Sequence, residues 1–312
     1  MATRTDVPGV ALITGAASGT SPKVRTAGWP HELPWSRSVM AVLHLTAFDT
    51  GIGRATALSF VQAGCTKLAL VDLDEAGLEV TKRLLTDTVW PTGVNPLVRT
   101  YKCDVSSPEG VVAAYAAAKG SFSRIDYSVH CAGIIVFGGP SADLPVEDFD
   151  RQNSINYRGL WLCSREAIRI MRSQPLDCEA YPEAKILPFR AQRGAIVNIS
   201  SALAVYAQPN CPAYCGAKAG VLALTRCDAL DYVADRIRVN AVLPGVVDSP
   251  MTNPSPEVRA WLEANPVQHT PMKRFGQPEE IADVAVFLAG NKASLVTGAS
   301  WTVDGGALAG WN

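Results

Sequence analysis

The chain begins with the first half of a glycine-rich turn, and the second half appears only after a long interruption. Residues 10–13 form a short apolar run typical of a buried strand, and residues 14–19 (Thr-Gly-Ala-Ala-Ser-Gly) begin the turn. Such a turn normally leads directly into a helix whose first amide groups bind the pyrophosphate of a dinucleotide. The expected helix start, Ile52-Gly53, follows only after residues 20–51. This pattern predicts a dinucleotide-binding turn that has been split.

The position of an acidic residue supports this interpretation. Residues 67–72 predict a buried parallel strand that ends in Asp72, which follows Gly53 by 19 residues. Dinucleotide-binding units place the acidic residue that binds the adenosine ribose about 20 residues after the glycine turn. Counted from Gly15, the separation is 57 residues, which is far too long. Gly53 therefore completes the turn, and the carboxylate favours NAD over NADP because it repels a 2′-phosphate.

Apolar strands and amphipathic helices alternate along the rest of the chain. Strand patterns occur at residues 97–103, 125–130, 194–201, 238–242 and 300–306, and helical patterns at 53–63, 75–86, 108–119, 149–172, 214–232 and 278–288. This alternation calls for a parallel sheet with helices on both faces and right-handed crossovers. We expect one doubly wound, Rossmann-type α/β domain over residues 1–312. Residues 173–193 lack periodicity and are interpreted as a surface excursion, and the proline-rich residues 246–276 as a mobile lid.

The composition is typical of a globular protein with a sizeable core. Hydrophobic residues make up 48% of the chain and charged residues 18%, and the net charge of −1 with scattered basic residues argues against nucleic-acid binding. No run approaches the roughly 18 apolar residues of a membrane span, and residues 1–8 lack the apolar core of a secretory signal. The eight cysteines have no metal-ligand spacing, so no metal site is predicted. We expect a cytoplasmic protein.

Three side chains have the chemistry needed to move a proton. Tyr214 and Lys218 are four residues apart at a predicted helix start, and therefore lie on one face. A phenol titrates near ~10, and a nearby ammonium lowers that pKa. Ser201 precedes Tyr214 by 13 residues at a strand end, where its hydroxyl can hydrogen-bond a substrate oxygen. An isolated Tyr-x-x-x-Lys is usually an exposed helix pair, but here it accompanies the glycine turn and Asp72 in the appropriate order.

Together these features resemble the classical short-chain dehydrogenase/reductase family over nearly the whole chain, except residues 20–51 and 173–193. Cys131-Ala132-Gly133 is similar to the family's Asn-Ala-Gly turn, with cysteine in the asparagine position, and Pro244-Gly245 resembles its nicotinamide-side turn. The family's four catalytic positions fall on Asn156, Ser201, Tyr214 and Lys218. The resemblance implies that Tyr214 is the general acid/base and that Ser201 polarises the substrate oxygen. Lys218 would lower the pKa of Tyr214 and bind the nicotinamide ribose, and Asn156 would hold a water in the proton relay.

The resemblance also implies which residues contact the cofactor. Asp104 and Val105 would border the adenine, and Val247 and Ser249 the carboxamide, with serine where the family usually has threonine. At position 131 a thiol replaces an amide, which weakens one adenosine-side hydrogen bond. The complete expected set consists of Gly15, Ser18, Gly19, Ile52, Gly53, Asp72, Asp104, Val105, Ala132, Gly133, Tyr214, Lys218, Pro244, Gly245, Val247 and Ser249.

The sequence therefore predicts an oxidoreductase that transfers a hydride between NAD(H) and a small-molecule secondary alcohol or ketone. Two alternatives stay open: an NADPH-dependent ketone reductase, and a non-catalytic dinucleotide-binding sensor or scaffold if the split turn is disabling. Substrate determinants are expected in residues 202–213 and 246–276, where apolar side chains indicate either a pocket for a hydrophobic, bulky or polycyclic substrate or packing: Leu203, Val205, Tyr206, Met251 and Trp261. The family resemblance implies a homodimer or homotetramer.

Residues 20–51 have neither a helical nor a strand period. One interpretation is a lid over the cofactor phosphates, and the other is an intron translated in frame. The genetic code allows a GTACGT donor across Gly19-Thr20-Ser21 and a CAG acceptor across Thr50-Gly51. Splicing there would restore Thr-Gly-Ala-Ala-Ser-Gly-Ile-Gly-Arg-Ala. We favour the intron hypothesis, and expect the insert to weaken NAD binding.

Overall fold

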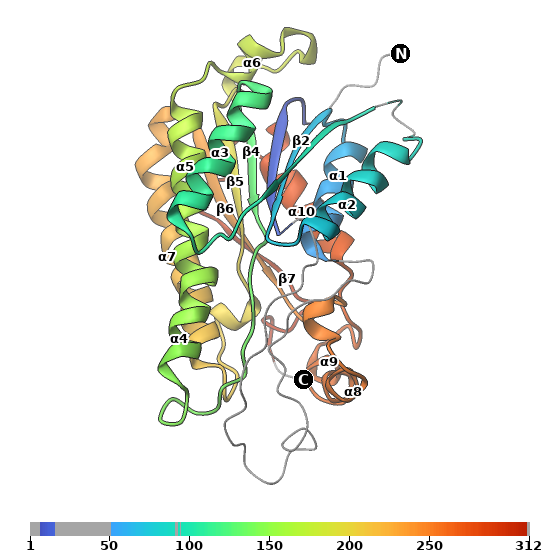
Figure 1. Ribbon diagram of the computed structural model, residues 1–312, viewed down its shortest axis with the longest axis vertical. Helices are drawn as coiled ribbons and strands as arrows, with labels where there is room; N and C mark the ends of the chain where they lie inside the picture. The colour runs from blue at the N-terminus through green and yellow to red at the C-terminus, as the bar shows by residue number, and fades with distance from the viewer. Residues whose placement is uncertain (1–6, 16–50, 91–92, 94, 311–312) are drawn as a thin grey trace.

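Short apolar runs form a seven-stranded sheet in the order β3-β2-β1-β4-β5-β6-β7 (Figure 1). The computed structural model describes residues 7–15, 51–90, 93 and 95–310. All six strand pairings are parallel, which confirms the predicted Rossmann-type α/β domain. The strands are β1 (Val10–Thr14), β2 (Lys67–Asp72), β3 (Leu97–Lys102), β4 (Tyr127–His130), β5 (Gly194–Ile199), β6 (Ile237–Pro244) and β7 (Ser300–Val303).

Helices cover both faces of the sheet, as the alternating pattern predicts. On one face lie α1 (Ile52–Gln62), α2 (Glu75–Asp87) and α10 (Pro278–Ala289), and on the other α3 (Pro108–Phe122), α5 (Leu160–Arg172) and α7 (Pro212–Tyr232) (Figure 1). Each face has its own apolar core, the first around Phe60 and Leu70 and the second around Tyr115 and Ile196. The strand order reverses between β1 and β4, and ligands of open parallel sheets bind at such a reversal, beyond the carboxyl ends of the strands.

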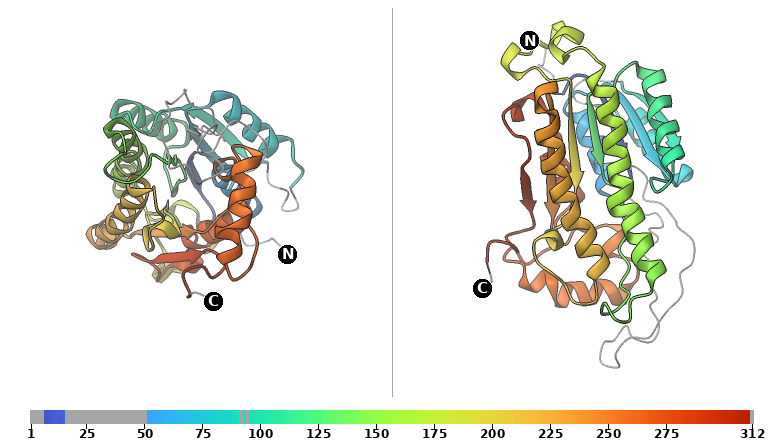
Figure 2. Two further views of the ribbon diagram at one scale, coloured as in Figure 1. Left: turned by 90° about the horizontal axis from the view of Figure 1, so that it is seen from below. Right: turned by 90° about the vertical axis from the view of Figure 1, so that its left-hand side faces the viewer.

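The helix predicted over residues 149–172 is longer and less regular than its pattern indicates. It begins as α4 (Val146–Asn153), passes through a π-helical turn, η1 (Ser154–Gly159), and continues as α5 beside α7 (Figure 2). The π-helical turn carries Asn156, whose side chain is fully buried. Its Oδ1 accepts a hydrogen bond from the Ile134 amide at 2.8 Å, and its Nδ2 donates one to the Ile134 carbonyl at 2.7 Å. The irregular turn therefore joins the helix to the loop after β4.

The excursion at residues 173–193 is ordered by hydrogen bonds to distant residues. It contains α6 (Asp177–Ala180), η2 (Pro182–Ala184) and η3 (Pro188–Arg190), and lies at the opposite end of the sheet from α8 (Pro256–Ala264) and α9 (Pro266–His269) (Figure 1). Tyr181 donates to Asp126 Oδ2 at 2.8 Å, and Asp177 accepts from the Gln192 amide at 3.0 Å and from Asn291 at 2.8 Å. Asp126 and Asn291 are far away in the chain, which is why no local pattern indicated structure here.

The predicted lid contains more helix than its five prolines suggest. Pro250, Pro256 and Pro266 each lie in the first turn of a short helix: η6 (Pro250–Thr252), α8 and α9. Proline is favoured there because the first amides of a helix have no intrahelical acceptor. Leu262, Val267 and Phe275 form a small separate core with the partly buried Trp261. The mobility of the lid stays a prediction.

Several predictions concern residues outside the described ranges, namely Ser18, Gly19 and the insert up to residue 50. Over the part of the chain that is described, no helix is long and apolar enough to cross a membrane. The same residues contain no group of three or more His, Cys, Asp or Glu side chains arranged to hold a metal ion.

Candidate active site

The turns after β1 and β4 pack so closely that no side chain fits between them. Gly15 has φ +69°, and a Cβ there would lie 2.7 Å from the amide nitrogen of Ala132. The Gly15 amide donates to the carbonyl of Val71 at 2.9 Å, which ties the turn to β2. Glycine is required here both by its backbone conformation and by this approach. The helix α1 begins at Ile52, and the next residue, Gly53, is buried.

Gly133 brings two of the predicted catalytic side chains together. A Cβ on Gly133 would lie 3.1 Å from Oδ1 of Asn156 and 3.5 Å from Nζ of Lys218. Both of those polar atoms therefore border the turn after β4. The Asn156 side chain is bonded to the backbone of Ile134 on both sides, so it fixes this turn as well as facing it.

Ser201 and Tyr214 meet at the carboxyl end of β5. The Ser201 hydroxyl accepts a hydrogen bond from the Leu203 amide at 3.1 Å, which holds the serine at the start of a 3₁₀ turn. Tyr214 is buried, and burial raises the pKa of its phenol to about 12, although hydrogen bonding with Ser201 lowers it. The expected net lowering of this pKa is therefore not found: desolvation dominates, and the phenol keeps its proton at neutral pH.

Lys218 is fixed to β5 at both its side chain and its backbone. Its Nζ donates to the carbonyl of Ile199 at 2.9 Å, and its own carbonyl accepts from the Ser200 hydroxyl at 2.8 Å. The ammonium lies 5.8 Å from the centre of the Tyr214 ring. Burial lowers the pKa of Lys218 to about 8, because the charged form is poorly solvated. The amine therefore remains mainly charged at neutral pH.

Apolar side chains surround Tyr214 and form what we call the Tyr214 cluster: Ile135, Phe137, Leu203, Cys211, Cys215 and Met251. Two of the five residues expected to form an apolar pocket, Leu203 and Met251, belong to it. Val205 and Tyr206 instead have exposed fractions of 62% and 37%, and Trp261 packs in the separate core of the lid. Ile135 and Phe137 were not expected from the sequence. They lie two and four residues after Gly133, and that proximity was the available signal.

Cys131 lies where the family pattern has asparagine. Its thiol has the Thr56 side chain of α1 as a hydrogen-bonding partner and interacts electrostatically with Lys218. Burial raises the pKa of the thiol to about 12, so it is uncharged at neutral pH. The cysteine therefore fills the space between α1 and α7 as a small neutral group.

The predicted adenosine-side residues follow β2 and β3. Asp72 Oδ1 accepts from the Asp74 amide at 3.0 Å, and Asp104 Oδ1 accepts from the amide and hydroxyl of Ser106 at 2.8 and 2.7 Å. Both carboxylates therefore shape the turn that follows their strand. Val105 is buried against Gly159, where a Cβ would lie 3.0 Å from the Val105 carbonyl oxygen.

The predicted nicotinamide-side residues follow β6. The Gly245 amide donates to Val303 at 3.0 Å, and a Cβ on Gly245 would lie 2.8 Å from Cα of Asp304. Val247 is buried and forms a bridge with Gly276 at the base of the lid. The Ser249 amide donates to the Thr252 hydroxyl at 3.1 Å. Thr252 was not expected to take part.

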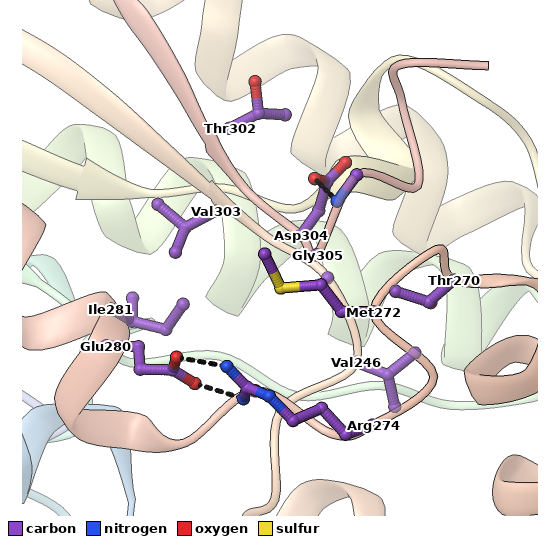
Figure 3. A pocket seen from close by; sticks show the side chains of 13 residues that line it. Val246, Thr270, Met272, Arg274, Glu280, Ile281, Thr302, Val303, Asp304 and Gly305 are labelled. Atoms are coloured by element: carbon purple, nitrogen blue, oxygen red, sulfur yellow. Dashed lines mark hydrogen bonds and ion pairs between the residues drawn. The ribbon is translucent and has the colours of Figure 1, made fainter.

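A cavity of about 310 Å³ lies beside Gly245. It is enclosed by the turn after β7 and by lid residues that include Thr270 and Met272, with the Arg274–Glu280 ion pair at 2.7 Å on its wall (Figure 3). Neither Ser201, Tyr214 nor Lys218 lines it. This cavity is therefore adjacent to the site with the proton-transfer groups and is not part of it.

The fold and these contacts define a dinucleotide-binding oxidoreductase site. A nicotinamide dinucleotide fits the residues present, since the Gly15 turn leaves room for backbone approach and Lys218 offers a buried ammonium beside Gly133. The residues that would hold it are the Gly15 turn, the start of α1, Gly133, Lys218 and the turn at Gly245.

Known proteins agree with this assignment. A family model described as short chain dehydrogenase matches residues 41–260. The short-chain dehydrogenase fogB of Aspergillus ruber is 38% identical over 259 residues, covering 82% of this chain and 92% of that protein. The cis-4-hydroxycyclohexanecarboxylate dehydrogenase of Sinomonas cyclohexanicum is 36% identical over 267 residues, covering 84% and 94%. The crystal structure of a putative short-chain alcohol dehydrogenase from Sinorhizobium meliloti 1021 superposes with a TM-score of 0.75 at 28% identity, covering 98% and 99%. The chain belongs to the short-chain dehydrogenase/reductase family and is an oxidoreductase.

Proposed function

We propose that the protein interconverts a secondary alcohol and its ketone with NAD(H), using Tyr214 as the general acid/base. The observation that carries this proposal is the hydrogen-bonded Ser201 and Tyr214 pair with the Lys218 ammonium 5.8 Å from the tyrosine ring. The cofactor supplies or accepts the hydride. Ser201 would hold the substrate oxygen, and Tyr214 Oη would donate a proton to it during reduction or remove one during oxidation.

The environment of the phenol favours its protonated form. With a pKa of about 12, Tyr214 is protonated at neutral pH, which is the form that donates to a carbonyl oxygen. Lys218, held by Ile199 and mainly charged, would stabilise negative charge that develops on the phenol oxygen when the proton leaves. The buried Asn156 would hold the loop after β4 in place and, through Gly133, the cofactor turn.

The Tyr214 cluster supports a hydrophobic substrate. Ile135, Phe137 and Met251 offer apolar surface beside the phenol, and a bulky or cyclic secondary alcohol would bury its hydrocarbon part there. One of the relatives above is named for a cyclic secondary alcohol, cis-4-hydroxycyclohexanecarboxylate. Asp72 supports NAD, because its carboxylate repels a 2′-phosphate. The cytoplasmic location and the homodimer or homotetramer expected from the sequence stay predictions.

The test is a panel of cyclic and acyclic secondary alcohols with NAD⁺ and NADP⁺, and of the matching ketones with the reduced cofactors, read from absorbance of the reduced cofactor. Turnover of apolar alcohols with a lower KM for NAD⁺ supports the proposal. A clear preference for NADP(H) supports the ketone-reductase alternative. Cofactor binding without turnover of any substrate supports the sensor or scaffold alternative.

A further inference from the structure

A chain of buried polar side chains crosses the sheet just behind the site. It starts with Tyr115 on α3 and Ser128 and His130 on β4, passes through Asn198 on β5 and ends at Thr225 on α7. All five side chains have exposed fractions of 2% or less. His130 directly precedes the Cys131-Ala132-Gly133 turn, and α7 carries Tyr214 and Lys218. This chain of polar side chains therefore connects the turn after β4 with the helix α7, the two parts of the site whose relative position matters.

The orientation of the Asn198 amide sets the direction of the hydrogen bonds in this chain. The Thr225 hydroxyl donates to the carbonyl of Val221 at 2.8 Å, so it accepts from the Asn198 amide nitrogen at 2.9 Å. That orientation turns Asn198 Oδ1 towards His130 Nδ1, at 2.8 Å. Nδ1 must therefore carry the proton, because an amide oxygen is only an acceptor.

The other imidazole nitrogen is then an acceptor. His130 Nε2 lies 2.9 Å from the Ser128 hydroxyl and 3.2 Å from the Tyr115 hydroxyl, and both can donate. Burial of the imidazole lowers the pKa of His130 to about 4, so the neutral ring is maintained at physiological pH. Every polar atom of the ring has a partner, which fixes its orientation.

We propose that His130, as the neutral Nδ1-protonated tautomer, is a positioning residue that sets the separation between the turn after β4 and the helix α7. Asn198 is the first of three consecutive residues hydrogen-bonded to α7, followed by Ile199 at the end of β5 and Ser200 just after it. A Cβ added to Gly133 would lie only 3.5 Å from Lys218 Nζ, so a small shift of the turn after β4 or of α7 alters the site. This role rests on the oxidoreductase function proposed above.

Kinetics of three variants test the proposal. Thr225→Val removes the hydroxyl that accepts the hydrogen bond from Asn198, so the Asn198 side-chain amide can flip. Thr225→Ser keeps the hydroxyl. Ile196→Val is the matched control, because Ile196 is buried on the same face of β5, two residues before Asn198, and its side chain has no hydrogen-bonding group. We expect kcat to fall about tenfold in Thr225→Val, and to stay near wild type in Thr225→Ser and Ile196→Val. Unchanged kcat in Thr225→Val, or an equal loss in Ile196→Val at a similar melting temperature, overturns the proposal.

A second measurement does not depend on turnover. In protein labelled with ¹⁵N-histidine, the His130 signals, assigned by their loss in His130→Asn, should show protonated Nδ1 and unprotonated Nε2 at pH 7. Thr225→Val should lose this fixed pattern and raise the Kd for NAD⁺, while Ile196→Val should do neither. The opposite tautomer in the wild type overturns the proposal. If no substrate is turned over but the tautomer and Kd results hold, the proposed function fails and the positioning of the cofactor turn stands.

Discussion

The Lys218 ammonium lies 5.8 Å from the centre of the Tyr214 ring while donating a hydrogen bond to the carbonyl of Ile199 at 2.9 Å. The lysine, which belongs to α7, therefore faces the phenol with its ammonium held by β5. A charge held in this way stabilises the phenolate without having to reorganise when the proton moves. Burial raises the pKa of the phenol and lowers that of the amine, because the charged form of each group is poorly solvated.

Tyr214→Phe is expected to reduce turnover by about 10²- to 10⁴-fold, because it removes the only proposed proton donor to the substrate oxygen. The ring and its packing in the Tyr214 cluster are retained, so the Kd for NAD⁺ should stay within about twofold. Initial rates and calorimetry measure the two quantities. Tyr232→Phe, at the other end of α7, is the control and should keep full activity. Retained activity in Tyr214→Phe would remove this residue from its assigned role.

The kcat of ketone reduction should be constant around neutral pH and fall as the pH rises through about 8. Below that value Lys218 is charged and Tyr214 protonated, whereas above it the lysine loses its charge long before the phenol titrates. The pH profile of kcat measures this. In Lys218→Arg the guanidinium stays charged, so the fall should move to higher pH. The same midpoint in both proteins would assign the titration to another group.

Much of this site follows from local sequence. A separation of four residues placed Tyr214 and Lys218 on one helix face; Tyr214 does hydrogen-bond Ser201 at a strand end, and the Lys218 ammonium lies 5.8 Å from its ring centre. Local sequence did not predict that the pKa of the Tyr214 phenol is raised. Its burial comes from Ile135, Phe137 and Met251, which belong to two other loops, and desolvation depends on how those loops fold over the ring. The predicted direction was wrong for that reason.

The irregular backbone of one helix was also not predicted from the sequence. The apolar period of residues 149–172 is compatible with a continuous α-helix, yet the chain inserts a π-helical turn at Ser154–Gly159. That turn is stabilised by the bonds between Asn156 and the backbone of Ile134, a contact across 22 residues that no helical period encodes. His130 was likewise overlooked as a strand residue, although a histidine in an apolar strand requires buried polar partners.

Asp72→Asn should weaken the preference for NAD⁺ over NADP⁺ by about tenfold or more in kcat/KM, because it removes the charge that repels a 2′-phosphate. The amide can still accept from the Asp74 amide nitrogen, so the turn should be preserved. Steady-state kinetics with both cofactors give the ratio. Asp74→Asn, which alters the capping residue of α2, should change stability but leave the ratio intact. An unchanged ratio in Asp72→Asn would mean that other groups select the cofactor.

His130 should make the fold sensitive to acid. Its folded-state pKa of about 4 lies below the ordinary 6.5, so at intermediate pH the unfolded chain binds a proton that the folded chain excludes. The contribution of the neutral His130 to the free energy of unfolding is fully present above pH 6.5. It is lost as the pH falls towards 4, by up to about 3 kcal/mol. Urea unfolding at pH 7 and 4.5 measures this loss. His130→Asn should be less stable at pH 7 but lose less on acidification, and an equal loss in both proteins would contradict the assignment.

Deleting residues 20–51 should tighten NAD⁺ binding. Gly15 and the start of α1 at Ile52 are both in place for a dinucleotide turn, and the deletion joins Gly19 directly to Ile52 as in an uninterrupted turn. Calorimetry should give a lower Kd for the shortened chain than for the full chain, with Tyr214→Phe in both backgrounds separating binding from turnover. Equal Kd values would show that the insert does not impair binding. Long-read sequencing of transcripts addresses its origin, because a mature message that keeps these codons would exclude the intron and leave the lid interpretation.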